Sequence, residues 1–469
     1  MLKNTKRTKI VCTLGPASEK EEVLTALIEN GLNVTRMNFS HGSHEEHKGR
    51  MDLVKKVREK LNKPVALLLD TKGPEIRTGK LVENPVTLKA EETFTLVNDD
   101  IIGDNTKTSI TYKDLYKDVE PGTTILIDDG KIEGKDIVCK VMNGGDLGNR
   151  KSINVPGRHI NLPALKEKDI NDLIDGCKYD FDYIAASFIR SADDVKAIRK
   201  VLDENGGEKI KIISKIESQE GIDNFDEILE VSDGIMVARG DMGVEIPMEE
   251  VPIVQKQLIK KCNTAGKIVI TATQMLESMT TNPRPTRAEV SDVANAIFDL
   301  TGAVMLSGES AMGKYPVQCV ETMSKIAHSI ENQISYDKRI ARRNLDFGNM
   351  DYKFYIHHSL SLTATQLGAK AIIAYTDAGN TPRIISSLLP TCPIIAVTTD
   401  EKTYRQLAIV ADVIPLLINE KGEPRDIIEK AIELNLIQKG DVLAIAGGDK
   451  ILPNSEASMN RTIGGIIKA

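Results

Sequence analysis

The chain has 469 residues, 41% of them hydrophobic and 28% charged, and its formal net charge at pH 7 is −7. This length exceeds one ordinary core and predicts two to four domains of ~100–200 residues each. The charges are spread along the chain without a basic block, which argues against nucleic-acid binding. The chain has no run of ~18 apolar residues, so no membrane span is predicted.

The chain as far as Ser307 repeats one pattern: an apolar run, a polar end to that run, and a segment with helical spacing. The intervening segments are amphipathic, as in Glu21–Asn30 and Ala288–Leu300. Strands buried on both faces of a parallel sheet are continuous apolar runs of this kind. Eight such units predict an α/β fold, the (β/α)₈ TIM barrel, whose active site lies at the carboxyl ends of the strands. The eight runs are Lys9–Gly15, Asn33–Asn38, Val65–Thr71, Tyr183–Phe188, Ile212–Glu217, Gly234–Arg239, Ile268–Thr273 and Ala303–Ser307.

A long stretch between the third and fourth runs follows a different pattern. Short β-like runs such as T-F-T-L-V and D-I-V-C-K-V alternate with turn signals such as Gly144-Gly145. This pattern predicts an all-β module inserted into a barrel loop. We assign residues 73–157 to this module, and residues 1–72 and 158–335 to the two parts of the barrel. Its natural role is a lid that closes over the barrel mouth and excludes water.

The last part of the chain, residues 336–469, is predicted to form a second, open α/β domain. A polar and aromatic segment, Ile334–Phe354, is expected to include a linker. Four apolar runs then alternate with helical stretches: Ala371–Thr376, Pro393–Thr398, Val413–Ile418 and Val442–Ala446. The six cysteines form no C-x-x-C pair, which is typical of reduced, mostly buried thiols, and we expect a cytoplasmic protein.

Polar and charged side chains follow six of the eight apolar runs. Taken singly, each is as consistent with a solvated strand end as with a site. In a barrel, however, all of these strand ends meet at one mouth, and their agreement favours a functional site there. In chain order they are Arg36, Asn38, Ser40, Asp70, Thr71, Lys72, Lys215, Glu217, Gly240, Asp241, Thr273, Gln274, Ser307 and Glu309.

The residue types at this mouth indicate metal and phosphate chemistry. Glu217 and Asp241 suit Mg²⁺, which takes one or two carboxylates and shares substrate oxygens. Arg36 and Lys215 would bracket a phosphoryl group, the arginine as a planar donor fork and the lysine as a compact charge. Gly240 and Asp241 open the next predicted helix, and backbone N–H groups at such a position suit a substrate carboxylate.

A second group of oxygens suits a monovalent cation. Asn38 and Ser40 follow the second run, and Asp70 and the Thr71 carbonyl end the third. Together they offer several oxygens but only one formal charge. This donor set fits K⁺ better than a second Mg²⁺.

Several long motifs occur in order along the chain. They are T-R-M-N-F-S-H-G, L-D-T-K-G-P-E-I-R-T-G, I-S-K-I-E, M-V-A-R-G-D-M-G-V-E, I-T-A-T-Q-M-L-E-S-M, N-P-R-P-T-R-A-E and M-L-S-G-E-S-A-M-G-K-Y-P. With them the chain closely resembles the pyruvate kinase family over nearly its whole length, in the form that lacks the extra C-terminal domain of some bacterial members. The family fold is a barrel with an inserted β lid and a C-terminal α/β domain. The resemblance implies phosphoryl transfer from phosphoenolpyruvate to ADP, giving ATP and, after protonation of the enol, pyruvate.

The resemblance also implies a role for each matching residue. Lys215 corresponds to the stabiliser of the transition state, and Glu217 and Asp241 to the ligands of Mg²⁺ or Mn²⁺. The other implied contacts are Arg36, Lys215, Gly240, Asp241 and Thr273 for the substrate; Thr273, Ser307 and Glu309 for delivery of the enol proton, with the donor left open; Asn38, Ser40, Asp70 and Thr71 for K⁺; and Asn38, Arg77 and Lys151 for the nucleotide.

Cation dependence, assembly and regulation are further expectations from the resemblance. A glutamate at the position of Glu75 goes with K⁺ dependence in this family, so we expect it here. The family is usually a homotetramer, and many members bind a sugar-phosphate effector in the C-terminal domain. The strand-to-helix turn with Thr376, Gly379, Asn380 and Thr381 suits a phosphate. An ordinary helix-capping turn is as good an interpretation, because the second effector loop reads G-G-D-K-I-L-P-N-S instead of being rich in Gly and Thr.

Two other classes of function remain open from the sequence. A Mg²⁺-dependent barrel lyase acting on a 2-oxo acid would explain Glu217 and Asp241, but not Lys215 or a lid that faces a nucleotide. A catalytically silent binding protein would be expected to lose the lysine or a metal ligand, and none is lost.

Two further motifs suggest chemistry that we do not expect. The stretch from Gly308 to Lys314 matches the first seven positions of a P-loop, but the Ser or Thr that binds Mg²⁺ is replaced by Tyr315. His41, His44 and His47 are spaced like metal ligands, yet we expect solvated histidines there and no zinc site.

Overall fold

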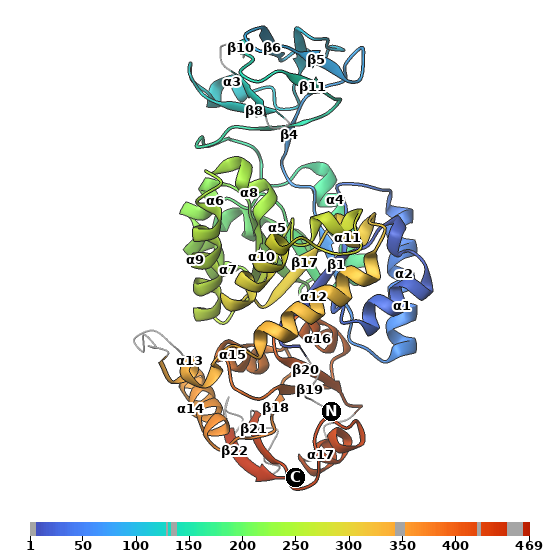
Figure 1. The fold of residues 1–469 in the computed structure, drawn as a ribbon, viewed down its shortest axis with the longest axis vertical. Helices are drawn as coiled ribbons and strands as arrows, with labels where there is room; N and C mark the ends of the chain where they lie inside the picture. Colours follow the sequence, from blue (N-terminus) through green and yellow to red (C-terminus); the bar gives the residue numbers. More distant parts are fainter. Residues whose placement is uncertain (1–5, 128–129, 133–137, 343–351, 420–423, 448–462) are drawn as a thin grey trace.

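The computed structural model describes residues 6–127, 130–132, 138–342, 352–419, 424–447 and 463–469. These residues form a barrel in the middle of an elongated molecule, an all-β module at one end and an α/β domain at the other (Figure 1). Within these ranges, no helix is long and apolar enough to span a membrane. The closed eight-stranded barrel, the inserted module and the C-terminal domain confirm the predicted fold class.

Eight parallel strands close the central barrel. Around the barrel they follow the order β1, β17, β16, β15, β14, β13, β3, β2. Each predicted run coincides with one of them, and only β14 begins outside its run, one residue earlier. The strands are β1 (Lys9–Thr13), β2 (Val34–Asn38), β3 (Ala66–Asp70), β13 (Tyr183–Ala186), β14 (Lys211–Ile216), β15 (Gly234–Ala238), β16 (Ile268–Ala272) and β17 (Ala303–Leu306).

The barrel strands form because their residues are apolar on both faces. All five residues of β3 are buried, since one face fills the barrel interior and the other packs against helices. The surrounding helices are α1 (Glu21–Glu29), α2 (His44–Leu61), α4 (Glu167–Lys178), α5 (Ala192–Glu204), α6 (Gln219–Asp223), α7 (Phe225–Val231), α8 (Arg239–Glu245), α9 (Val251–Thr264), α10 (Arg287–Phe298), α11 (Gly308–Ala311) and α12 (Pro316–Glu331), with short 3₁₀ turns at Pro16–Ser18 and Glu277–Thr280.

The base of the barrel shares an apolar core with the C-terminal domain. Leu68 and Met236, on barrel strands, belong to the same buried cluster as Ile372 and Ile394 of that domain. Lys9, at the start of β1, also donates to the Val413 carbonyl over 2.7 Å. The C-terminal domain therefore covers the amino-terminal ends of the strands, which leaves their carboxyl ends available for a site.

The inserted module has small antiparallel sheets and its own core, which includes the fully buried Phe94. Its sheets are β10-β6-β7, β11-β5 and β4-β12-β8-β9, with one parallel pair, β6 and β7. A short helix, α3, departs from the predicted all-β pattern. The module's elements are β4 (Ile76–Arg77), β5 (Val86–Leu88), β6 (Thr93–Val97), β7 (Lys107–Ser109), α3 (Leu115–Asp118), β8 (Ile125–Ile127), β9 (Gly130–Ile132), β10 (Val138–Lys140), β11 (Gly145–Leu147) and β12 (Ser152–Asn154).

The C-terminal domain is an open sheet in the order β20-β19-β18-β21-β22. The first four strands are parallel and match the four predicted runs, whereas β22 pairs antiparallel with β21 and was not predicted. Part of the expected linker is helical, because α13 lies within Ile334–Phe354 and α14 begins near the end of this segment, at Tyr352. The elements are α13 (Tyr336–Arg342), α14 (Tyr352–Gln366), β18 (Ala371–Tyr375), α15 (Asn380–Ser387), β19 (Ile394–Thr398), α16 (Glu401–Gln406), a 3₁₀ turn (Leu407–Ile409), β20 (Val413–Leu417), α17 (Pro424–Glu433), β21 (Val442–Gly447) and β22 (Ile463–Lys468).

Candidate active site

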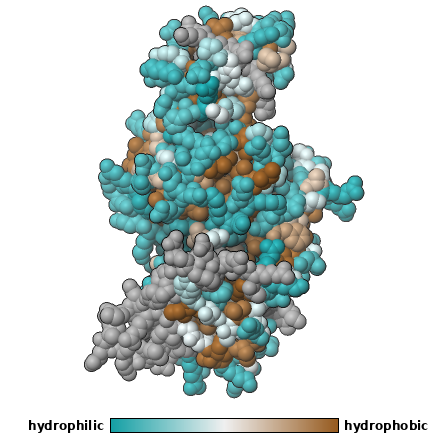
Figure 2. All heavy atoms as spheres, turned by 90° about the vertical axis from the view of Figure 1, so that its left-hand side faces the viewer, coloured by the Kyte–Doolittle hydropathy of each residue, from teal (hydrophilic) through white to brown (hydrophobic). Residues whose placement is uncertain are grey.

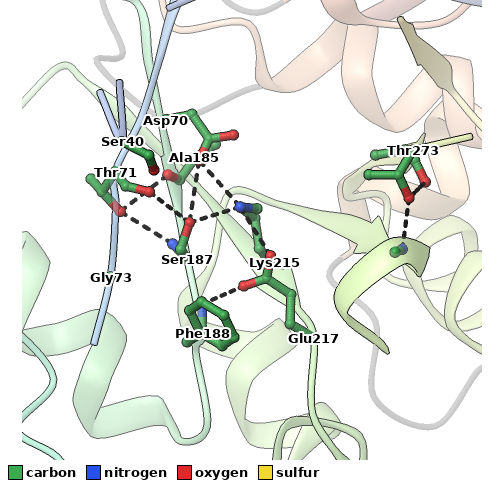
Figure 3. A network of polar contacts seen from close by, with 12 residues as sticks. Ser40, Asp70, Thr71, Gly73, Ala185, Ser187, Phe188, Lys215, Glu217 and Thr273 are labelled. Carbon is green, nitrogen blue, oxygen red and sulfur yellow. Dashed lines mark hydrogen bonds and ion pairs between the residues drawn. The ribbon is translucent and has the colours of Figure 1, made fainter. Parts of the chain in front are cut away.

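The barrel brings the polar ends of neighbouring strands together. Asn38 at the end of β2 is in register with Asp70 at the end of β3, and Asp70 is in register with Ala185 of β13. Lys215 lies on the next strand, β14. Figure 3 shows Asp70, Lys215 and Glu217 pointing toward one another across this part of the mouth.

Lys215 is the centre of this network. Its Nζ lies 2.7 Å from Ser187 Oγ, 2.9 Å from Glu217 Oε1 and 3.2 Å from Asp70 Oδ1, and the residue is only 8% exposed. Burial alone would lower the pKa of the lysine, but the charges of Asp70 and Glu217 outweigh it and raise that pKa above its ordinary value. The lysine is therefore a buried ammonium at neutral pH.

Arg36 is tied to the same network through Asp70. Its Nε donates to Asp70 Oδ2 over 2.5 Å, and its NH1 donates to Thr13 Oγ1 over 2.8 Å. Burial would raise the pKa of Asp70, but Arg36 and Lys215 outweigh that effect and lower it. One buried carboxylate thus holds two cations side by side, as an anion-binding site for a phosphoryl group requires.

Glu217 has an oxygen without a hydrogen bond. Its Oε2 accepts from the Phe188 backbone N–H over 2.5 Å, while Oε1 has no hydrogen-bond partner despite its closeness to Lys215. Burial, with Asp241 adding to it, raises the pKa of Glu217 to about 7. A buried oxygen of this kind is completed by a cation, and this fits the predicted divalent metal.

Asp241 lies in the first turn of α8 and is exposed, in contrast to Glu217. Within the described residues, no group of three or more His, Cys, Asp or Glu is placed to hold a metal. Two carboxylates that leave coordination positions for water and substrate suit Mg²⁺ or Mn²⁺ better than a closed structural site.

Thr273 faces the start of α8 from the end of β16. Its Oγ1 accepts from the Gly240 N–H over 2.7 Å, so that N–H, expected to meet a substrate carboxylate, is bonded within the protein. Thr273 has φ = 70°, which is rare for a β-branched residue and marks a conformation that the surroundings impose. Arg239 NH2 donates to the Thr273 carbonyl over 2.7 Å and helps to hold this turn.

Glu309 is not open to the mouth as a free acid would be. The residue is fully buried, and its carboxylate accepts from the backbone N–H groups of Ser307 (2.7 Å) and Leu276 (3.1 Å). Burial raises its pKa. Glu309 therefore links the loops that follow β16 and β17 by hydrogen bonds to their backbone, close to Ser307.

The oxygens expected to bind a monovalent cation gather beside this network. Figure 3 shows Ser40, Asp70 and Thr71 close together. Asn38 Oδ1 accepts from the Ser40 N–H over 3.1 Å, which fixes the turn after β2. Ser187 Oγ donates to the Thr71 carbonyl over 2.7 Å.

A cavity of about 400 Å³ lies between the barrel mouth and the inserted module. Arg77, Asp241 and Glu245 are among its lining residues. Arg77 is held by Glu75 Oε2 at 2.6 Å and donates to the Arg150 carbonyl over 2.8 Å, whereas Asn38 and Lys151 do not line this cavity. Asn154 of β12 donates to Glu245 Oε1 over 2.8 Å, a contact between module and barrel that the sequence did not suggest.

The turn at Thr376–Thr381 lies in the C-terminal domain, away from the mouth. Thr376 Oγ1 accepts from the Gly379 N–H over 2.8 Å, and Gly379 adopts φ = 80° before α15 begins at Asn380. Thr403 Oγ1 donates to the Asp377 carbonyl over 2.7 Å. These bonds are those of a capping turn, and the second effector loop lies outside the described residues beyond Gly447.

The P-loop-like stretch and the histidines at positions 41, 44 and 47 form ordinary local structure. The P-loop-like stretch contains only the four-residue helix α11, and α12 begins separately at Pro316. His44 contacts Asp172 at 2.9 Å and Asp175 at 2.5 Å. His47 is buried and stacked on Phe39 with ring centroids 4.2 Å apart, so the expectation of a solvated side chain was wrong for His47.

Sequence reasoning missed Ser187, although it lies in a predicted run. The first and fourth runs were the two whose ends received no role. The pattern itself was the signal that could have identified it.

Comparisons with known proteins agree with this geometry. Residues 5–320 match the model of the pyruvate kinase barrel domain, and residues 355–461 match that of the pyruvate kinase alpha/beta domain. The chain is 56% identical to a pyruvate kinase from Clostridium acetobutylicum and 50% identical to one from Clostridium perfringens, covering 94% of this chain and 96% of each relative. A crystal structure of a pyruvate kinase from Cryptosporidium parvum aligns with a TM-score of 0.93 at 40% identity, over 99% of this chain and 96% of that one. The chain belongs to the pyruvate kinase family.

Proposed function

We propose that this protein transfers the phosphoryl group of phosphoenolpyruvate to ADP and so produces ATP and pyruvate. The observation that carries the proposal is the buried Lys215 ammonium, held between Asp70 and Glu217 at 3.2 and 2.9 Å. A fixed cation in a buried site stabilises charge on a transferring phosphoryl group without reorganisation at the moment of reaction.

Glu217 and Asp241 would hold Mg²⁺ or Mn²⁺, and Glu217 Oε1, which lacks a hydrogen bond, supports this assignment. When bound, the divalent ion supplies charge neutralisation for phosphoryl oxygens. Asn38, Ser40, Asp70 and the Thr71 carbonyl would hold K⁺. Their oxygens already lie on adjoining strand ends around one carboxylate.

Arg36 and Lys215 bind and orient the phosphoryl group from the side of the mouth formed by β2 and β14. After transfer, the enol of pyruvate must receive a proton at carbon. We assign this delivery to the side of the mouth that carries Thr273, Ser307 and Glu309. Thr273 Oγ1 lies 2.7 Å from the Gly240 nitrogen, where it would meet substrate bound at the start of α8.

The inserted module would act as a lid over the nucleotide. Arg77 lines the cavity between the lid and the barrel, and together with Lys151 and Asn38 it would contact ADP or ATP. Closure of such a lid excludes water from the reacting groups. We keep residues 1–72, 73–157, 158–335 and 336–469 as the limits of the domain segments.

We further propose a cytoplasmic homotetramer. Figure 2 shows the barrel face that carries α9, where hydrophobic residues interrupt a largely hydrophilic surface. Met248 and Ile253, just before and within α9, are 70% and 57% exposed. Exposed apolar groups at one place suit a subunit contact. A sugar phosphate at Thr376, Gly379, Asn380 and Thr381 would be the effector.

A coupled assay for pyruvate tests the function directly. The purified protein receives phosphoenolpyruvate with and without ADP, and Mg²⁺ or K⁺ is left out in turn. We expect pyruvate only when ADP and Mg²⁺ are present, and a clear loss of rate without K⁺. Pyruvate formed without ADP would favour a lyase, and full activity in K⁺-free buffer would contradict the cation assignment.

A further inference from the structure

Ser187 lies between Lys215 and the oxygens proposed to bind K⁺ (Figure 3). Its Oγ accepts a hydrogen bond from Lys215 Nζ over 2.7 Å and donates to the Thr71 carbonyl over 2.7 Å. Asp70 Oδ1, at 3.2 Å, is the alternative acceptor. A hydroxyl has one proton and two lone pairs, so these contacts use its only donor and one of its two acceptor positions.

Lys215 has three N–H donors, and three acceptors surround it: Ser187 Oγ, Glu217 Oε1 and Asp70 Oδ1. A bound phosphoryl group must take over at least one of these donors. The contact with Glu217 is the one without hydrogen-bond geometry, because Oε1 has no hydrogen-bond partner. When Glu217 serves the proposed metal, Ser187 and Asp70 remain as the two anchors of the ammonium.

Ser187 is itself held firmly. Its backbone N–H donates to Thr71 Oγ1 over 3.2 Å. The backbone of Gly73 passes directly over it, so that a Cβ at Gly73 would lie 2.8 Å from Ser187 Cβ. Gly73 has φ = 73°, which a glycine adopts at little cost. The hydroxyl therefore has little freedom except rotation between its two acceptors.

We propose that Ser187 is a positioning residue that couples occupancy of the monovalent-cation site to the placement of Lys215. The inference rests on the proposed function, since it assigns a device within that site. The Thr71 carbonyl is bonded to Ser187 on one side and would coordinate the cation on the other. Binding of the cation fixes this carbonyl, the carbonyl fixes the hydroxyl, and the hydroxyl fixes one of the two anchors of the ammonium.

The test compares Ser187→Ala with the wild-type protein, Ser187→Cys and a matched control. The cysteine keeps the approximate size of the side chain and a weak donor. The control is Ser232→Ala, another buried serine of the barrel domain, which precedes β15 and whose Oγ contacts Ser214 Oγ at 2.7 Å and donates to the Ile228 carbonyl over 2.7 Å. Two quantities are measured for each protein: the K⁺ concentration that half-maximally raises the melting temperature, and the turnover number at saturating K⁺.

For Ser187→Ala we expect a several-fold higher K⁺ midpoint and a turnover about 10–100-fold lower, because a hydrogen bond to a charged group is lost. Ser187→Cys should fall between alanine and wild type, and Ser232→Ala should keep both values. An unchanged K⁺ midpoint in Ser187→Ala, or no K⁺ effect on wild-type melting, would overturn the coupling. The melting measurement needs no catalysis. If the wild type makes no pyruvate, the proposed function fails. The coupling inferred here is tested separately, by the K⁺ midpoints of melting.

Discussion

Strand β13 has buried charged groups at both of its ends, and the two groups differ in how completely their carboxylate oxygens are hydrogen-bonded. At its amino-terminal end, Asp182 accepts from Arg405 Nε over 2.9 Å and from the Leu67 N–H over 2.9 Å. Arg405 also contacts Asp180 at 2.7 Å. At its carboxyl-terminal end, the network around Lys215 includes a carboxylate oxygen, Glu217 Oε1, that has no hydrogen bond.

The comparison separates a structural charge cluster from the one for which we propose a function. Both oxygens of Asp182 are satisfied by the protein, so that cluster fastens the C-terminal domain to the barrel and has nothing left to offer a ligand. Burial raises the pKa of both Asp182 and Glu217, so the two clusters differ in the Glu217 oxygen that lacks a hydrogen bond. An incompletely hydrogen-bonded buried carboxylate therefore supports the proposed place for substrate and metal.

The largest effect is expected from removing the charged side chain of Lys215 at the barrel mouth. Lys215→Ala should lower turnover roughly a thousandfold, because one preorganised charge that stabilises the transition state is lost. The Michaelis constant for phosphoenolpyruvate should change little if the lysine acts mainly on the transition state. Steady-state kinetics measure both values, and circular dichroism checks the fold. A variant that loses only substrate affinity would contradict this role.

The second effect concerns the cluster at the other end of β13. Arg405→Ala leaves Asp182 buried without its ion-pair partner, and this should lower the free energy of unfolding by about 3 kcal/mol. Chemical denaturation measures the loss, and Lys402→Ala is the control, because the ion pair of Lys402 is with the exposed Asp180. Turnover of the folded fraction should remain close to wild type. A large fall in turnover without a loss of stability would erase the distinction between the two clusters.

The sequence was sufficient for the barrel and for most of its mouth, for physical reasons. Strands buried on both faces are continuous apolar runs, and a polar residue at the end of each run can be recognised locally, as with Asp70 and Lys215. The pairing of Asp182 with Arg405 could not be predicted, because it joins residues 223 positions apart and neither residue stands out in its own segment. Strand β22 was missed because Gly464-Gly465 interrupts its apolar pattern, and glycine is disfavoured in strands.

The smallest effect tests whether an unpartnered buried atom always indicates function. His357 in α14 is 2% exposed, and its Nδ1 has no hydrogen-bond partner, yet it lies in the C-terminal domain and not at the mouth. Burial, with the charge of Lys353 adding to it, lowers the pKa of His357 to about 4. In the unfolded chain the same side chain titrates near 6.5.

Between these two pKa values only the unfolded state binds a proton, so acid favours unfolding. The free energy of unfolding should therefore fall as the pH drops from about 6.5 toward 4, with about 2 kcal/mol lost between pH 7 and pH 5 on account of this residue. Denaturant unfolding of wild type and His357→Leu at both pH values measures this loss as the difference between their pH dependences, in which any packing change cancels. Turnover at pH 7 should be unaffected. If the variant keeps the full pH dependence of the wild type, the histidine is not the source of the acid sensitivity. If it loses turnover instead, unpartnered atoms distant from the mouth also serve catalysis, and the contrast between the two ends of the barrel is too simple.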